Sequence, residues 1–261
     1  MAIVNVTPDS FYAASRTMEG AAIRERVQTA LDEGAAILDV GGYSSRPGAE
    51  EVSVEEEFAR LARAMEIVRG DFGSVNVSID TFMGSVARRV IERYGPCIVN
   101  DISGGELDPE MIDVVAEYNV PYITMHMVGT PQTMQQHVDY DDVTDAVIAF
   151  FDRKLAQLDA RGVKQAIIDP GFGFSKTTRQ NHELLQNMDR LLCFGRPVLA
   201  GLSRKSMIYK PLKTDPQRSL IGTAAMNWEA LRKGASILRV HDVKAAADVI
   251  NLYKYHVNRD L

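Results

Sequence analysis

The chain has 261 residues, of which 46% are hydrophobic and 25% charged, and it carries a formal net charge of −6. This length exceeds that of a typical β-sandwich but suits one α/β barrel, so we expect a single domain, residues 1–261, with a large core. The acidic balance and the aromatic content of 7% argue against a nucleic-acid surface. No apolar run approaches the ~20 residues that a membrane span needs, so we expect neither nucleic acid nor a membrane as partner.

The two cysteines, Cys97 and Cys193, lie far apart and lack the spacing of a metal site. We expect both thiols to be buried and the protein to work in the reducing cytoplasm. No signal peptide is recognisable. The first apolar run begins so close to Met1 that a preceding N-terminal segment is compatible with the sequence.

Short, nearly continuous apolar runs recur along the chain, as expected of parallel strands that are buried on both faces. The expected strands are Ala2–Val6, Ala36–Val40, Val75–Ile79, Cys97–Asn100, Tyr122–Met125, Ala166–Ile168, Pro197–Ala200 and Ser236–Arg239.

Between these runs the apolar period becomes helical. One pattern runs from Val54 to Val68 at spacings of three and four, and Ser53 with Glu56 forms a capping box before it. Gly34 and Gly162 fit the positions that end two further helices. Such strand–helix units, repeated eight times in about 250 residues, predict a (β/α)8 TIM barrel. A doubly wound sheet is the alternative, but the turn NVTPDSF lacks its glycine-rich dinucleotide motif.

Polar residues follow nearly every expected strand, at the end where barrel enzymes build their active sites. Asp80, Asn100 and Asp169 supply acceptors and one amide, and Lys205 supplies a donor for a ring acceptor. This set suits a flat bicyclic heterocycle with an aminopyrimidine edge, and Met125 or Phe174 would cover its face.

Each of these residues also has a structural interpretation. Asp80 could cap the next helix, and the Asp169-Pro-Gly sequence could form a plain turn. Asn100 and Asp101 could satisfy loop amides, Asp39 could be a buried carboxylate of the barrel floor, and His126 is more typical of a structural residue than of a zinc ligand. However, a buried carboxylate costs several kcal/mol unless it is paired, so several at one site favour a common polar partner.

A second group of residues is cationic. Ser44, Ser45 and Arg46 lie in a Gly/Pro loop, and Arg239 and His241 follow the last strand. The segment Ser203-Arg204-Lys205 should open a helix whose free amides favour anions. Positive charge at one end of an acidic barrel predicts a small anionic substrate, with phosphate bound by the last two loops.

Taken in order along nearly the whole chain, these motifs resemble the dihydropteroate synthase family, the pterin-binding enzymes of folate biosynthesis. The matching stretches include NVTPDSF, DVGG, SSRPGA, NDI, MHM, DPGFGF, SRKSMI and RVHDV. The resemblance implies transfer of a 7,8-dihydropterin-6-ylmethyl group from its diphosphate to 4-aminobenzoate, with Mg²⁺ as cofactor. It also implies a homodimer and inhibition by sulfonamides.

The resemblance further implies roles for individual residues, with Asp80, Lys205 and Arg239 as the catalytic ones. Asn5 matches the magnesium ligand. The pterin contacts are Asp80, Asn100, Ile102, Met125, Asp169, Phe174, Gly201 and Lys205; the diphosphate contacts are Ser45, Arg239, Val240 and His241; the aminobenzoate contacts are Ser45, Arg46, Pro47, Ser203 and Phe174; and loop one comprises Thr7, Pro8, Asp9, Ser10 and Phe11.

Two departures from the family pattern concern the loops. Ser45 stands where threonine is usual, and FYAASR replaces a more common glycine-rich sequence after the first strand. Two alternatives remain, a pterin-dependent methyltransferase domain and a non-catalytic pterin-binding homologue. The diphosphate motifs SSRPG, SRKS and RVHDV favour the synthase over the methyltransferase, and the presence of Asn5, Arg239 and Lys205 argues against the non-catalytic homologue.

Overall fold

The computed structural model describes residues 1–6, 16–43 and 52–257. Its strands form one eight-stranded sheet in the order of the sequence, and neighbouring strands are all parallel. The strands are β1 (Ala2–Asn5), β2 (Leu38–Gly41), β3 (Val77–Asp80), β4 (Ile98–Asp101), β5 (Tyr122–Met125), β6 (Ala166–Asp169), β7 (Val198–Ala200) and β8 (Ala235–Leu238).

The sheet curls until its two edges meet. Ala2 forms a parallel bridge with Val240, just beyond β8. The backbone N–H of Ile3 donates to the Val240 carbonyl at 3.0 Å, and that of Val240 donates to the Met1 carbonyl at 3.0 Å. The terminal strand β1 is therefore paired on both sides, as the predicted TIM barrel requires.

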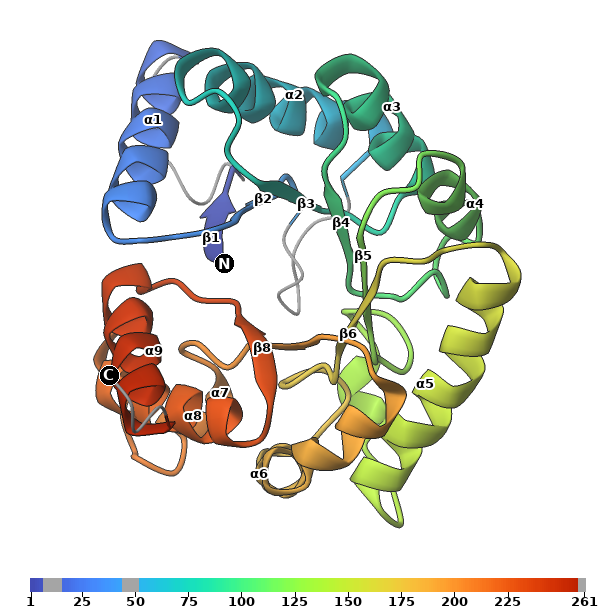
Figure 1. Cartoon of the computed structure of the whole chain (residues 1–261), viewed down its shortest axis with the longest axis vertical. Coiled ribbons are helices and arrows are strands. Elements are labelled where there is room, and N and C mark those ends of the chain that lie inside the picture. The colour runs from blue at the N-terminus through green and yellow to red at the C-terminus, as the bar shows by residue number, and fades with distance from the viewer. Residues whose placement is uncertain (7–15, 44–51, 258–261) are drawn as a thin grey trace.

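Helices surround the strands (Figure 1). They are α1 (Arg16–Asp32), α2 (Val54–Asp71), α3 (Gly84–Tyr94), α4 (Glu110–Glu117), α5 (Val143–Ala160), α6 (Thr178–Gln186), α7 (Ser206–Tyr209), α8 (Leu220–Arg232) and α9 (Val243–Val257), with short 3₁₀ helices η2 (Met134–Gln136), η3 (Met188–Phe194) and η4 (Pro216–Arg218). No helix within the described ranges is both long enough and apolar enough to span a bilayer.

Because side chains alternate in direction along each strand, the outer face of the sheet is apolar, while the inner face carries both apolar and polar side chains. In β2, Leu38 and Val40 belong to the main core, while Asp39 between them is equally buried but polar. The same alternation in β3 sends Val77 and Ile79 to the core and leaves Asp80 on the opposite face. The core therefore lies mainly between sheet and helices, and the barrel interior is free to hold polar groups.

Several predicted details need correction. Strands β2 and β3 begin two residues later and end one residue later than predicted, and the ladder continues through Gly41 and Asp80, which follow the two apolar runs. Ser53 Oγ accepts from the Glu56 N–H at 3.3 Å, but the Glu56 carboxylate pairs with Arg60, so only half of the capping box forms. Cys97 is buried as predicted, whereas Cys193 is exposed on η3.

Candidate active site

One row of residues crosses the carboxyl ends of the first four strands. Asn5 pairs with Gly41, Gly41 with Asp80, and Asp80 with Asn100. A Cβ on Gly41 would lie 3.4 Å from the Asp80 Cβ and 3.6 Å from Asn5 Oδ1. The missing side chain thus lets the Asn5 amide oxygen and the Asp80 carboxylate share this end of the barrel.

Arg239, just beyond β8, reaches across to this row. Its Nε donates to Asp39 Oδ2 at 2.6 Å, and its Nη2 donates to Asp80 Oδ2 at 2.6 Å. Asn100 Nδ2 donates to Asp39 at 3.2 Å, so the fully buried Asp39 is well partnered. Asp39 thus supports the site through Arg239 and Asn100. In the sequence, Asp39 is recognisable as a carboxylate inside an apolar strand.

The electrostatics of Asp80 reflect opposing effects. Burial raises the pKa of Asp80 above its usual range, Arg239 opposes that rise, and Asp39 and Glu57 add to it. Because the guanidinium lies 2.6 Å away, we infer that the carboxyl group stays ionised. The expectation that Asp80 merely caps the next helix is wrong, because the N-cap of α3 is Met83.

Glu57 of α2 is a site neighbour that sequence reasoning missed. It is fully buried, and neither carboxylate oxygen has a hydrogen-bond partner among the described residues. A Cβ on Gly42 would lie 3.3 Å from the Glu57 Cγ, so Glu57 packs directly behind the end of β2. Burial raises the pKa of Glu57 to about 7, against smaller effects of Thr81 and Arg60.

Asp169 and Lys205 meet at the ends of β6 and β7. Asp169 Oδ1 accepts from the Gly171 N–H at 2.7 Å. A Cβ on Gly201 would lie 3.5 Å from Lys205 Nζ and 4.0 Å from Asp169 Oδ2, so this glycine lets the two charges approach. Burial lowers the pKa of Lys205 to about 8, and Asp169 opposes the decrease. The ammonium therefore stays mostly protonated at neutral pH.

A small apolar cluster, separate from the main core, lies beside these charges. Its buried members are Ile102, Met125, Met127 and Met134, and Phe82 and Phe174 pack against it. The Lys205 ammonium lies 4.9 Å from the centre of the Phe174 ring. Predicted packing residues Ile102, Met125 and Phe174 are thus brought together, next to the predicted polar contacts.

Ser203 and His241 join the loops after β7 and β8. Ser203 Oγ lies 3.0 Å from His241 Nδ1 and accepts from the His241 backbone N–H at 3.2 Å. Arg26 of α1 donates to the His241 carbonyl at 2.9 Å. Burial, Arg239 and Arg204 lower the pKa of His241 to about 4. The imidazole is therefore neutral at pH 7 and shares a hydrogen bond with the serine.

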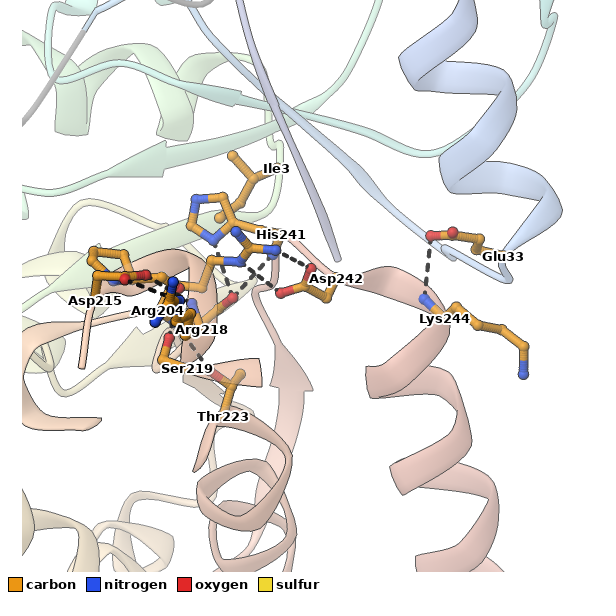
Figure 2. Close-up of polar contacts among 12 residues, drawn as sticks. Ile3, Glu33, Arg204, Asp215, Arg218, Ser219, Thr223, His241, Asp242 and Lys244 are labelled. Atoms are coloured by element: carbon orange, nitrogen blue, oxygen red, sulfur yellow. Dashed lines mark hydrogen bonds and ion pairs between the residues drawn. The ribbon is translucent and has the colours of Figure 1, made fainter. Parts of the chain in front are cut away.

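Arg204 has a different position from the one its motif suggested. Its Nε donates to Asp242 Oδ2 at 2.9 Å, and its backbone N–H donates to Thr223 Oγ1 at 3.2 Å (Figure 2). The Arg204 guanidinium thus links the loop after β7 to the loop after β8. The helix expected after Lys205 is also only the single turn α7, so its amides provide a weaker anion site than predicted.

Asp101 follows its structural interpretation. Its oxygens accept from the Ser103 N–H, the Ser103 hydroxyl, the Gly105 N–H and the Tyr122 hydroxyl, each at 2.7 Å. All four bonds stay within its own loop and the next strand. Asp101 therefore supports the loop after β4 rather than presenting a free carboxylate.

The remaining predicted residues divide into two groups. The side chain of Val240 is buried in the main core, and its N–H and C=O both serve the closure of the barrel. The others lie outside the described residues: Thr7, Pro8, Asp9, Ser10 and Phe11 of loop one, and Ser45, Arg46 and Pro47 of the second loop.

Asn5 is the predicted magnesium ligand. No group of three His, Cys, Asp or Glu residues in the described part of the chain could hold a metal ion by itself. Mg²⁺ is usually held by one or two protein oxygens together with waters and substrate phosphates. The Asn5 amide oxygen, close to Asp80, fits such a minimal site.

Known proteins with similar sequences and folds belong to one family. Residues 1–241 match the family described as pterin binding enzyme. The dihydropteroate synthase of Synechocystis sp. is 41% identical over 252 residues, which cover 95% of this chain and 86% of the relative.

Two solved structures share the fold at similar coverage. The dihydropteroate synthase of Xanthomonas albilineans with 4-aminobenzoic acid superposes with a TM-score of 0.91 at 36% identity, covering 99% of this chain and 92% of the other. The Yersinia pestis enzyme in a sulfonamide drug complex has a TM-score of 0.91 at 35% identity, covering 98% and 93%. The chain therefore belongs to the dihydropteroate synthase family of pterin-binding enzymes.

Proposed function

We propose that this protein condenses (7,8-dihydropterin-6-yl)methyl diphosphate with 4-aminobenzoate to give 7,8-dihydropteroate and diphosphate. The C–O bond to the diphosphate breaks, a C–N bond to the amine forms, and the amine loses a proton. One observation carries the proposal: acceptors for a flat heterocycle, Asp80, Asn100 and Asp169, lie at the same end of the barrel as Arg239 and His241.

The pterin ring would lie among Asp80, Asn100, Asp169 and Lys205, with its face on Phe174. Carboxylate oxygens suit the N–H donors of an aminopyrimidine edge, and the lysine suits a ring acceptor. As the leaving group departs, positive charge develops on the pterin methylene carbon, and the ionised Asp80 would stabilise it. Gly201 would keep the approach to Lys205 and Asp169 open.

The leaving diphosphate would be received by Arg239, His241 and Ser203. Arg239 uses only Nε and one terminal nitrogen for Asp39 and Asp80, so its other N–H groups can reach an anion. The neutral His241 can donate a hydrogen bond and gain a proton as phosphate charge approaches. Mg²⁺ held by Asn5 would neutralise further charge on the diphosphate.

The aminobenzoate would bind near Ser203 and Phe174, the two described members of the set that the family resemblance assigns to it. Support comes from the Xanthomonas albilineans relative with 4-aminobenzoic acid and the Yersinia pestis relative with a sulfonamide drug. We therefore also propose that sulfonamides compete with aminobenzoate on this protein.

An assay with the purified protein tests the proposal. Incubation with the pterin diphosphate, 4-aminobenzoate and Mg²⁺ should form dihydropteroate and diphosphate in equal amounts, and a chelator should suppress the rate. Binding of pterin without product would favour the non-catalytic homologue. Methyl transfer from a folate to a corrinoid protein, in place of condensation, would favour the methyltransferase alternative.

We also propose a homodimer built from α8 and α9, which pack on each other. These helices carry large apolar side chains that are exposed in the single chain, namely Leu220, Ile221, Leu252, Tyr255 and Val257. Light scattering should give twice the mass of 28.9 kDa for the parent protein, and Ile221→Asp should shift it towards the monomer. A monomeric parent protein would contradict this assembly.

Two broader expectations complete the proposal. We propose that residues 1–261 form one domain, since one sheet uses strands from Ala2 to Leu238. Limited proteolysis should then yield no stable fragment of half the length.

We also propose a cytoplasmic location, which the free cysteines Cys97 and Cys193 favour and which fractionation of cells would test.

A further inference from the structure

The turn that follows β6, residues 171–174, is held by two lysine side chains. Lys176 Nζ donates to the carbonyl oxygens of Gly171 and Phe174, each at 3.0 Å. Lys205 Nζ donates to the carbonyl oxygen of Phe172. Three carbonyl groups of this turn, those of Gly171, Phe172 and Phe174, thus accept from lysine side chains, although only Lys205 belongs to the predicted site.

Lys176 is buried and has no carboxylate within hydrogen-bond reach among the described residues. Its side chain is 3% exposed, and its Nζ lies 2.9 Å from His126 Nδ1 and 3.4 Å from the His126 carbonyl oxygen. Burial and the Lys176 charge lower the pKa of His126 to about 2, so the ring is neutral and Nδ1 accepts from the ammonium. Burial lowers the pKa of Lys176 to about 7, although the nearby Asp169 charge opposes this decrease, so keeping the amino group charged here is costly for the fold.

The turn is fitted closely to its surroundings. Gly171 and Gly173 have φ values of 73° and 83°, in the left-handed region that favours glycine. A Cβ on Gly171 would lie 2.0 Å from the His126 carbonyl oxygen. The turn therefore packs against the end of β5 with no room for a shift towards it.

Two proposed pterin contacts depend on this turn. The Gly171 N–H donates to Asp169 Oδ1 at 2.7 Å and so orients that carboxylate. Phe174 is the last residue of the turn, and its carbonyl is one of the two that Lys176 holds. The amino group of Lys176 thus acts on both residues through the backbone.

We propose that Lys176, with His126 as its acceptor, is a positioning residue for the dihydropterin ring. It fixes the 171–174 turn so that Asp169 and Phe174 keep the orientation that the ring needs. The inference rests on the proposed assignment of Asp169 and Phe174 to the pterin, and it extends that site to two buried residues that touch no substrate.

The test replaces Lys176 with methionine, which keeps the apolar stem and removes the ammonium. Affinity for 6-hydroxymethyl-7,8-dihydropterin, measured by titration calorimetry, should fall about tenfold or more, because small misplacements of binding groups are costly. In the full assay the KM for pterin diphosphate should rise by a similar factor, with a smaller change in the KM for aminobenzoate at saturating pterin.

Lys154→Met is the matched control. Lys154 is also a 3% exposed lysine, but its ammonium pairs with Glu106 and the side chain of Gln157 on the outer layer. This variant should lose thermal stability without a change in pterin affinity, which separates loss of a buried charge from loss of positioning. If both variants lost pterin affinity in proportion to their stability, the inference would be overturned.

A second variant covers the case in which Lys176→Met does not fold. His126→Gln keeps a side-chain acceptor and should retain pterin affinity within about threefold, whereas His126→Leu removes the acceptor and should lose more. Equal affinities for these two and for the parent protein would refute the role of the pair. Failure of the parent protein to bind pterin would instead refute the proposed function.

Discussion

Ion pairs in the barrel interior and ion pairs on the helix layer differ in how deeply they are buried and in how far apart their partners lie in the sequence. Arg239, with a side chain 20% exposed, joins Asp39 and Asp80, which lie 200 and 159 residues away in sequence. On the helix layer, the Arg93–Glu66 pair is more than half exposed on both sides. Exposed pairs add little stability, whereas interior ones require desolvation of both charges. The interior pairs therefore indicate a site for a polar ligand rather than a device for stability.

The largest effect on folding should come from breaking the interior pair on one side. Arg239→Met leaves the buried Asp39 with Asn100 alone, and we expect a loss of about 3–5 kcal/mol in unfolding free energy. Denaturant titration measures it. The double variant Asp39→Asn/Arg239→Met should recover part of the loss, and a single variant within 1 kcal/mol of the parent would contradict the account.

The largest effect on activity should come from the charges assigned to the pterin. Asp80→Asn and Lys205→Ala should each lower kcat/KM by about a hundredfold or more, since each removes a pre-oriented charge. Steady-state rates of dihydropteroate formation provide the measurement. Rates within about tenfold of the parent would remove these residues from the catalytic set.

Glu57 allows a pH test of the interior. The pKa of Glu57 is raised from 4.5 to about 7 in the folded state. The protonated carboxyl group therefore contributes its full stabilisation below pH 4.5, and this contribution is lost as the pH rises through 7. Glu57→Gln should therefore match the parent near pH 5 and be more stable at pH 8 by about 2 kcal/mol. Thermal or urea unfolding at both pH values measures the difference. A pH-independent difference would mean that Glu57 is ionised throughout.

The smallest effect should be on the helix layer. Arg93→Ala removes an exposed pair with Glu66 and should change the unfolding free energy by less than about 1 kcal/mol, with kcat/KM unchanged. Salt should reduce even this difference. A loss as large as that of Arg239→Met would remove the distinction between the two kinds of ion pair.

The sequence allowed the barrel to be predicted because apolar strands and helical periods alternate without interruption. It also located Asn5, Asp80, Asn100, Asp169, Lys205 and His241 at strand ends, since that position follows from strand boundaries alone. The strand ends themselves were less predictable, because hydrogen bonding across β2 and β3 continues through Gly41 and Asp80 after the apolar run has ended.

Contacts between distant segments could not be derived from the sequence. Arg204 lies in a basic motif that predicts anion binding by the helix it opens, yet its guanidinium pairs with Asp242, 38 residues further on. Lys176 belongs to the motif that begins at Asp169, but its contacts with His126 and the turn could not be derived from the sequence, because only folding brings these groups together. Such pairings depend on which strands become neighbours and how deeply each charge is buried.

A crystal structure of the protein with (7,8-dihydropterin-6-yl)methyl diphosphate and Mg²⁺ is the most direct test of one shared site. The bicyclic ring should contact Asp80, Asn100, Asp169 and Lys205, with the phosphates at Arg239 and His241. A ligand bound elsewhere, or a ring that meets none of those carboxylates, would contradict the assignment.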